Sequence, residues 1–121
     1  MGEPLVRGEI VFDSPPETLT GATIWIRLED TSMADMFSEV VVERALADLP
    51  AKLAADERIP FSLCGPTPDP RTSYSLSVHV DLRSSGQLDH GDYVNVASYP
   101  VLTFGYPSFV TVRVQRVGGA A

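Results

Sequence analysis

Acidic side chains gather at one predicted turn, where they could bind a cation or shape the backbone. Asp30 and Asp35 flank a short polar stretch that includes Thr31 and Ser32. Carboxylate and hydroxyl oxygens are the ligands that hard cations prefer. The spacing does not match an EF-hand loop, which also requires a central glycine and a glutamate at its last position. We therefore expect Asp30 or Ser32 to cap a turn by accepting hydrogen bonds from backbone N–H groups.

A second polar loop places an imidazole between two carboxylates, in Asp89-His90-Gly91-Asp92. These residue types allow a weak metal site. The sequence has only one other histidine, His79, and it falls on the polar side of a predicted strand. We expect a polar loop here and assign no metal ligand.

The sequence carries little that resembles catalytic machinery. Its single cysteine, Cys64, cannot form an internal disulfide. A reactive thiol requires a nearby cation or a helix N-terminus, whereas Cys64 lies between an apolar residue and a Gly-Pro pair, so we expect a packed or half-exposed thiol. No Gly-x-Ser-x-Gly elbow, phosphate-binding glycine loop or His-Glu-x-x-His motif is present. We assign no catalytic residue and no cofactor, and we expect no enzymatic activity.

Aromatic side chains are the better candidates for recognition. Alternation places Trp25 and Arg27 opposite the apolar face of their strand, and both residue types are enriched at interfaces. A neighbouring loop or strand covering Trp25 is the alternative. A further group either covers one end of the core or forms an exposed patch: Tyr93, Tyr99, Phe104, Tyr106 and Phe109. The candidate partner-binding residues are Trp25, Arg27, Tyr106 and Phe109.

Strands must position these residues, because apolar side chains recur at every second position. The clearest run is 73–83, where five apolar residues alternate with polar ones, as in a strand with one buried face. Pro60 cannot donate a ladder hydrogen bond, so we expect its strand at an edge of the sheet. The first strand is the other expected edge. The same alternation predicts strands around 6–12, 23–30, 59–63, 93–97 and 110–115.

Turn signals separate these runs, and the regular spacing favours a sandwich or barrel over an α/β fold. Ser84-Ser85-Gly86 between alternating runs predicts a hairpin. The stretch 33–58 is ambiguous: we expect a strand near 38–44, followed by a loop or a short helix in the Ala- and Leu-rich segment 45–57. Residues 1–117 are expected to form one domain, with a disordered tail at 118–121.

Composition narrows the function classes. The chain has 121 residues, 44% of them hydrophobic, which supplies a core for one domain. Its net charge is −7, and its nine basic residues are scattered, with Lys52 the sole lysine. Nucleic-acid binders normally carry a basic face, so we expect no nucleic-acid partner, and we interpret the acidity as a solubility feature.

The sequence sets limits on the cellular compartment. No apolar run approaches the length of about 18 residues that a membrane span requires, so we expect no membrane insertion of this chain. The start, Met1-Gly2-Glu3-Pro4, lacks the basic and apolar regions of a signal peptide. We expect a cytoplasmic protein if the chain is native and full length, and a periplasmic or outer-membrane one if a lipoprotein leader has been removed.

Four stretches, taken in order, carry a resemblance to a known family. They are Val6-Arg7-Gly8-Glu9-Ile10; the strand and turn from Ile24 to Asp35; Ile59-Pro60-Phe61-Ser62-Leu63; and Tyr74-Ser75-Leu76-Ser77-Val78 combined with Tyr99-Pro100-Val101-Leu102-Thr103. The chain resembles the YbaY/YscW-like family of small bacterial lipoproteins, which includes pilot proteins of type III secretion. The resemblance spans roughly residues 6–117, nearly the whole chain.

The resemblance implies an immunoglobulin-like or transthyretin-like antiparallel β-sandwich of about seven or eight strands. It also implies a cell-envelope setting and a non-enzymatic, protein-binding or assembly-assisting role. Two features depart from the family pattern. The first residues of the sequence show no leader pattern and no lipidation cysteine, so we do not carry membrane anchoring over from the family. The segment 45–57 is also longer and richer in alanine than the family pattern.

Two other functions remain open from the sequence. One is a small-molecule or metal-binding domain that uses the acidic turns. The other is a structural domain that forms a homodimer through an edge strand, because an open edge can pair with another chain.

Overall fold

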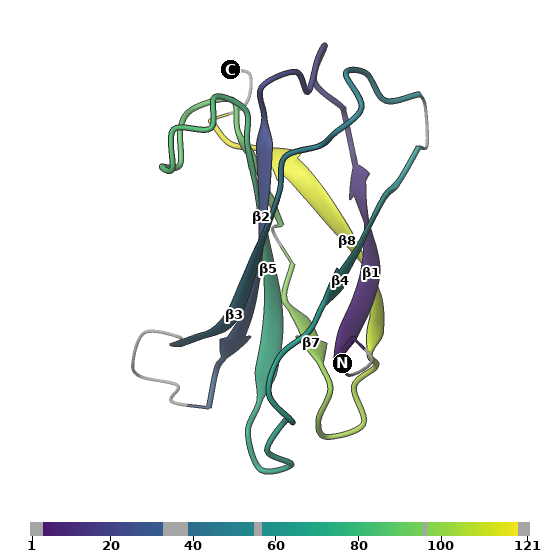
Figure 1. The fold of residues 1–121 in the computed structure, drawn as a ribbon, viewed down its shortest axis with the longest axis vertical. Helices are drawn as coiled ribbons and strands as arrows, with labels where there is room; N and C mark the ends of the chain where they lie inside the picture. Colours follow the sequence, from purple (N-terminus) through teal and green to yellow (C-terminus); the bar gives the residue numbers. More distant parts are fainter. Residues whose placement is uncertain (1–3, 33–38, 55–56, 96, 119–121) are drawn as a thin grey trace.

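The computed structural model describes residues 4–32, 39–54, 57–95 and 97–118. Within these residues the chain forms eight strands and no helix (Figure 1). The all-β prediction is therefore confirmed, and the described part of segment 45–57 is strand end and loop. The strands are β1 (Val6–Phe12), β2 (Thr23–Asp30), β3 (Glu39–Leu46), β4 (Ile59–Leu63), β5 (Tyr74–Asp81), β6 (Tyr93–Asn95), β7 (Tyr99–Val101) and β8 (Phe109–Arg116).

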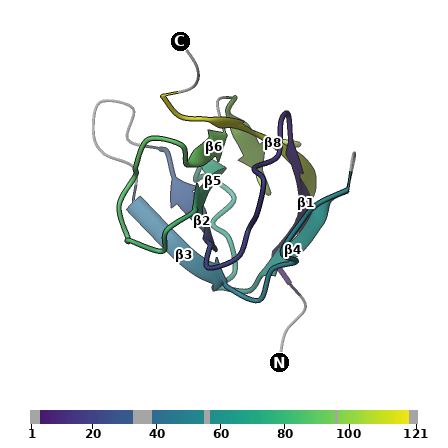
Figure 2. The same ribbon diagram turned by 90° about the horizontal axis from the view of Figure 1, so that it is seen from above.

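All eight strands belong to one sheet, in the order β3-β2-β5-β6-β8-β1-β4, with β7 pairing with β5 off this path. The sheet curls until its two end strands, β3 and β4, approach each other, so that it resembles a barrel that has not quite closed (Figure 2). Hydrogen bonds run continuously around the sheet, and the predicted sandwich of two separate layers is not confirmed.

The predicted antiparallel pairing is wrong at one place. Six of the seven strand pairings are antiparallel, but β1 and β8 run parallel, with Arg7 opposite Phe109 and Phe12 opposite Val114. A parallel pair needs a long connection, and nearly the whole chain separates the first strand from the last. Alternation of side chains cannot reveal this, because it carries no information about strand direction.

One of the two predicted sheet edges is correct and the other is wrong. Among the described strands, β4 ends the sheet, as Pro60 predicted, but β1 lies between β8 and β4 and is not an edge. The other end is β3, whose residues are mostly exposed or half-buried.

The core fills the inside of this curled sheet. Its side chains come from the inward-facing positions of the strands, as the two-residue period requires. In β2, for example, Ile24, Ile26 and Leu28 are buried, while Trp25 and Arg27 between them are half-buried on the outer face. The largest of the fully buried side chains are Ile10, Leu19, Ile24, Ile26, Leu28, Leu63, Leu76, Val6, Val78, Val80, Val101 and Val112.

One glycine allows the closest strand contact. A Cβ atom at Gly8 in β1 would lie 2.3 Å from the carbonyl oxygen of Val110 in β8. It would also lie 2.6 Å from Cζ of the Phe61 ring in β4. Gly8 therefore lets β4 and β8 pack against β1 on the inner face.

Among the described residues, no helix has the length and apolar character needed to cross a bilayer.

Candidate binding groove at the open seam of the sheet

The two end strands of the sheet meet along a seam that side chains, rather than a regular ladder, hold together. Nη1 of Arg44 in β3 donates to the carbonyl oxygen of Ser62 in β4 at 2.8 Å and lies 3.3 Å from the Ser62 hydroxyl oxygen. A Cβ atom at Gly65, just after β4, would lie 3.5 Å from Cβ of Val42 in β3. The middle of β3 therefore lies close to the C-terminal end of β4 and the residues just after it.

The free edge of β4 offers little for strand pairing. Because the Ser62 carbonyl faces the seam, the backbone of Pro60, two residues earlier in the same strand, faces it too. Pro60 has no N–H to donate, and Arg44 already occupies the Ser62 carbonyl. Proline and basic side chains on an edge strand are common ways of preventing unwanted strand addition.

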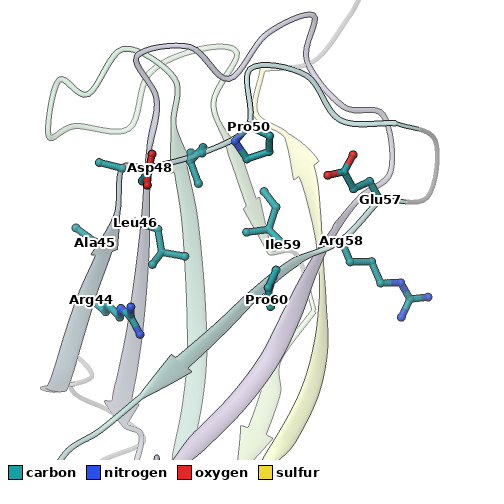
Figure 3. Close-up of a pocket in the computed structure, with 11 residues that line it drawn as sticks. Arg44, Ala45, Leu46, Asp48, Pro50, Glu57, Arg58, Ile59 and Pro60 are labelled. Carbon is teal, nitrogen blue, oxygen red and sulfur yellow. The ribbon is translucent and has the colours of Figure 1, made fainter.

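Beyond Arg44 the two strands diverge and leave a groove of about 480 Å³ (Figure 3). Leu46 of β3 and Ile59 of β4 point into the opening from opposite sides, and Pro50 lies above them. Leu46 and Leu49 also pack against the core. The groove is thus an apolar opening that reaches the core, with a volume in the range typical of ligand-binding clefts.

The sequence explains why the groove stays open. Ala47, just after β3, is an exposed small side chain that lines the opening and does not fill the space between the strands. Beyond it Pro50 also lacks an N–H, so it cannot extend the β3 ladder. The Ala- and Leu-rich composition of 45–57, which left helix and loop open in the sequence, marks this wall of the groove.

Charges of both signs form the rim of the groove. Arg44 and Arg58 contribute two positive charges, and Asp48 and Glu57 contribute two negative ones. Arg58 points away from the opening and forms an ion pair with Glu9 on β1. With Arg58 paired to Glu9, the charges left at the rim are those of Arg44, Asp48 and Glu57, a net charge of −1, which fits a largely apolar occupant rather than a highly charged one.

The lining residues in the described part of the chain include no histidine, cysteine, serine or threonine. Common nucleophiles and the usual general base are therefore missing from the groove lining. The arrangement can bury apolar side chains and hold polar groups at its rim, which is the chemistry of binding.

Trp25, a candidate partner-binding residue, anchors a loop. Its indole Nε1 donates to Oδ2 of Asp81 at 3.3 Å, beneath the long β5–β6 loop at 82–92. The backbone N–H groups of Ser85 and Gly86 donate to the same buried carboxylate at 3.1 and 2.9 Å. Trp25 is thus half-buried, and its indole N–H already bonds to the carboxylate that holds this loop.

Burial acts to raise the pKa of the Asp81 carboxyl. Hydrogen bonds from the Gly86 and Ser85 N–H groups oppose burial, with further help from the Trp25 indole and the charge of His79. Together they outweigh burial and hold the pKa of Asp81 below its ordinary value. The ionised carboxylate is the form that organises the loop.

The acidic cluster around His79 also holds the 82–92 loop against the sheet. In the described part of the chain, His79, Asp81 and Asp92 bring one ligand atom each within 4.8 Å of one another. The oxygens of buried Asp92 accept from the Leu82 N–H at 3.0 Å, the Asp89 N–H at 3.0 Å and lie 2.8 Å from Nε2 of His79. With N–H donors directed at these oxygens, the cluster has the contacts of a loop anchor rather than of a cation site.

The sequence grouped Asp89-His90-Gly91-Asp92, and the structure gives the side chains of Asp89, His90 and Asp92 different partners. Asp89 accepts from the Ser85 hydroxyl at 2.7 Å, and His90 lies close to Gly118. Ser84-Ser85-Gly86, predicted as a hairpin, is only the first turn of the 82–92 loop, because Asp81 and Asp92 tie the longer excursion to the sheet.

At the other acidic turn, Oδ1 of Asp30 accepts from the Ser32 N–H at 2.9 Å, and the Ser32 hydroxyl accepts from the Ser73 N–H at 2.9 Å. The predicted turn-capping role is confirmed for both residues. Asp35 lies outside the described residues, as do residues 119–121 of the expected tail. Cys64 is exposed, rather than packed or half-exposed, just beyond β4.

The other candidate partner-binding residues have different surroundings. Arg27 forms an ion pair with Glu43 across the β2–β3 pair. Tyr106 and Phe109 are 52% and 56% exposed. Phe104, which belongs to the same aromatic group but was not a partner-binding candidate, is 64% exposed. These aromatic residues lie in and beside the β7–β8 loop, at the opposite end of the molecule from the groove (Figure 1).

The fold places the chain among small all-β proteins whose single sheet nearly closes on itself. It is similar to the solved structure of an alternative pilotin from the type II secretion system of Vibrio cholerae, with a TM-score of 0.71 and 16% sequence identity. The similarity covers 94% of this chain and 96% of that one. No protein-family model matches the chain, and no curated protein sequence matches it. At this identity the likeness establishes a shared fold.

Proposed function

We propose that this protein is a non-enzymatic binding module that holds a segment of another protein in the groove between β3 and β4 and thereby assists assembly. The observation that carries the proposal is the gap in an otherwise continuous sheet, where an apolar opening of about 480 Å³ reaches the core. Burial of apolar side chains is the dominant favourable term in most protein association.

The walls of the groove indicate how a segment would be held. Apolar side chains of the partner would contact Leu46, Leu49 and Ile59, which supply the apolar floor. Polar groups at the ends of the segment would meet Arg44, Asp48 or Glu57 at the rim. Strand addition at β4 is unfavourable because of Pro60, so side-chain burial contributes most of the affinity.

A charge placed in the groove tests this proposal. Ala47 is exposed and lines the opening, so Ala47→Arg should block the groove and leave the fold intact. Ala97→Arg, at an exposed position away from the groove, is the matched control. Purification of tagged protein from its native host should recover a specific partner with the wild type and the control, and lose it with Ala47→Arg. Equal recovery with both variants would contradict the proposal.

Tyr106 and Phe109 remain proposed partner contacts, since both stay exposed. Trp25 and Arg27 are weaker candidates, because Asp81 and Glu43 already engage them. A second copy of the chain is the alternative occupant of the seam.

We also propose that the chain belongs to the YbaY/YscW-like group and works in the cell envelope. The order of its four sequence stretches supports this, as does its similarity in fold to a pilotin of a secretion system. Fractionation of host cells tests the location. Recovery with the envelope fraction is expected, and recovery with the cytoplasm would contradict it.

A further inference from the structure

The loop between β7 and β8 holds its aromatic residues in an unfavourable backbone conformation. Leu102 has φ 75°, and the Thr103 N–H donates to the Val101 carbonyl at 2.9 Å, which defines a γ-turn of the rare, strained kind. Phe104 and Gly105 follow with φ of 55° and 83°, and the Tyr106 N–H donates to the Thr103 carbonyl at 3.0 Å.

Two positive φ values inside a four-residue turn define a type I′ turn, whose first central position favours asparagine, aspartate or glycine. Phenylalanine is costly there, because a left-handed conformation crowds its Cβ atom. Yet the Phe104 ring contributes little to the core, since it is 64% exposed. Backbone strain that a fold does not need for packing is typical of functional sites.

Phe104 and Tyr106 form one wall of a hollow of about 300 Å³ on the outer side of the β5–β7 pair. The rest is lined by Tyr74, Pro100 and the hydroxyl-bearing side chains of Thr31, Thr103 and three serines. The Thr31 and Thr103 hydroxyls donate to the carbonyls of Ser73 and Thr72 at 3.3 and 2.6 Å. The groups offered to a ligand are therefore the hydroxyls of Ser73, Ser75 and Ser98.

No charged side chain is among the described residues that line this hollow, although 21% of the chain is charged. A charged ligand would lose its hydration there without gaining an ion pair. Serine hydroxyls both donate and accept hydrogen bonds, and an exposed aromatic ring offers a flat apolar face. The complementary ligand is neutral, carries several hydroxyl groups and has one apolar face.

A pyranose ring has this combination, with hydroxyls around its rim and C–H groups on its face. We propose that the hollow beside Phe104 and Tyr106 binds a neutral sugar residue, which stacks on the Phe104 ring and hydrogen-bonds to the serines of β5 and the β7 segment. This site is independent of the groove between β3 and β4, and either can fail without the other.

The strain at Phe104 gives a sharp test. Phe104→Gly removes the ring and suits the observed φ, so it should leave the melting temperature unchanged or raise it. The same variant should raise the Kd for a sugar at least about tenfold. Leu88→Ala, which truncates an exposed apolar side chain on the distant 82–92 loop, is the control and should leave the Kd unchanged.

The measurement is an NMR titration of the full chain with methyl glucoside, methyl galactoside and N-acetylglucosamine, with glucose 6-phosphate as the charged comparison. We expect shift changes at residues 73–75 and 98–106 with at least one neutral sugar, and weaker changes with the phosphate. The absence of changes with all three neutral sugars would overturn the proposal. So would equal binding by Phe104→Gly, or tighter binding of the phosphate.

Discussion

Gly8 illustrates how a single residue determines the closure of the sheet. Its inner face touches two neighbouring strands, because the Val110 carbonyl and the Phe61 ring lie where a side chain would begin. The sequence shows a glycine within an alternating strand, which indicates a close approach of some kind. It cannot show which strands approach, since β4 and β8 are distant in the chain.

We predict that Gly8→Ala lowers the free energy of unfolding by about 3 kcal/mol, the upper end of the range for overpacking a core. Urea denaturation followed by circular dichroism measures this change. Gly21→Ala is the comparison, because a Cβ there has open space and only its φ of 80° is unfavourable. A smaller loss at Gly8 than at Gly21 would contradict the close packing described for β1.

The ionisation of Asp81, which anchors the loop at 82–92, makes the stability of the folded chain depend on pH. Because hydrogen bonds hold its pKa below the unfolded value, ionised Asp81 stabilises the folded chain at neutral pH. That contribution starts to disappear as the pH falls below the unfolded pKa of about 3.9 and is lost as it passes the lower folded pKa.

Asp81→Asn should therefore cost about 2 kcal/mol at pH 7 and make stability less dependent on pH below 4. Thermal unfolding from pH 2 to 7 checks both effects. Asp13 also has a lowered pKa, mainly through its hydrogen bond with Arg113, so Asp13→Asn is the matched surface control. A wild-type acid dependence that Asp81→Asn retains in full would contradict the role given to Asp81.

At the scale of elements, alternation predicted the strands well. The strands at 6–12, 23–30 and 59–63 have the predicted bounds, because one buried face imposes a period of two. A hairpin does join β5 and β6, which pair antiparallel, but its loop is longer than 84–86, because Asp81 and Asp92 tie down an excursion that local turn chemistry could not reveal. The short strand β7 was missing from the alternation analysis, since only three residues pair there.

The hydrogen bond from Arg44 to Ser62 joins β3 to β4 at the seam. We predict that Arg44→Ala costs at most about 1 kcal/mol, because the bond to Ser62 is exposed. Amide hydrogen exchange should nevertheless become faster in β3 and β4, the end strands of the sheet. Arg83→Ala, on the exposed 82–92 loop, is the control. Unchanged exchange in both end strands would show that Arg44 does not hold the seam.

At the scale of the whole molecule, the sheet closes almost completely through the parallel pairing of β1 with β8. The groove is a consequence of that closure, since it lies where the two remaining ends fail to pair. Sequence analysis identified Pro60 as an edge and 45–57 as unusual, but it did not connect them. Residues from two distant segments form the site, and only the folded topology brings them together.

Because the fold brings distant segments together, the sequence could predict only part of the surroundings of the candidate binding residues. The sequence correctly placed Trp25 on the outer face of its strand but could not show that its indole bonds to Asp81, the anchor of the 82–92 loop. Tyr106 and Phe109, chosen as partner-binding candidates, are both exposed, and their role stays a prediction. Phe104 belonged to the same aromatic group, but the sequence could not show that its backbone adopts a conformation that phenylalanine seldom adopts.

Photo-crosslinking from inside the groove tests the central claim most directly. A photoreactive amino acid replaces Ala47 in one variant and Ala97 in the other, and adducts formed in the native host are identified by mass spectrometry. The account predicts an adduct with one partner protein from position 47 and none with that protein from position 97. No adduct from position 47, or an adduct only with a second copy of this chain, would contradict it.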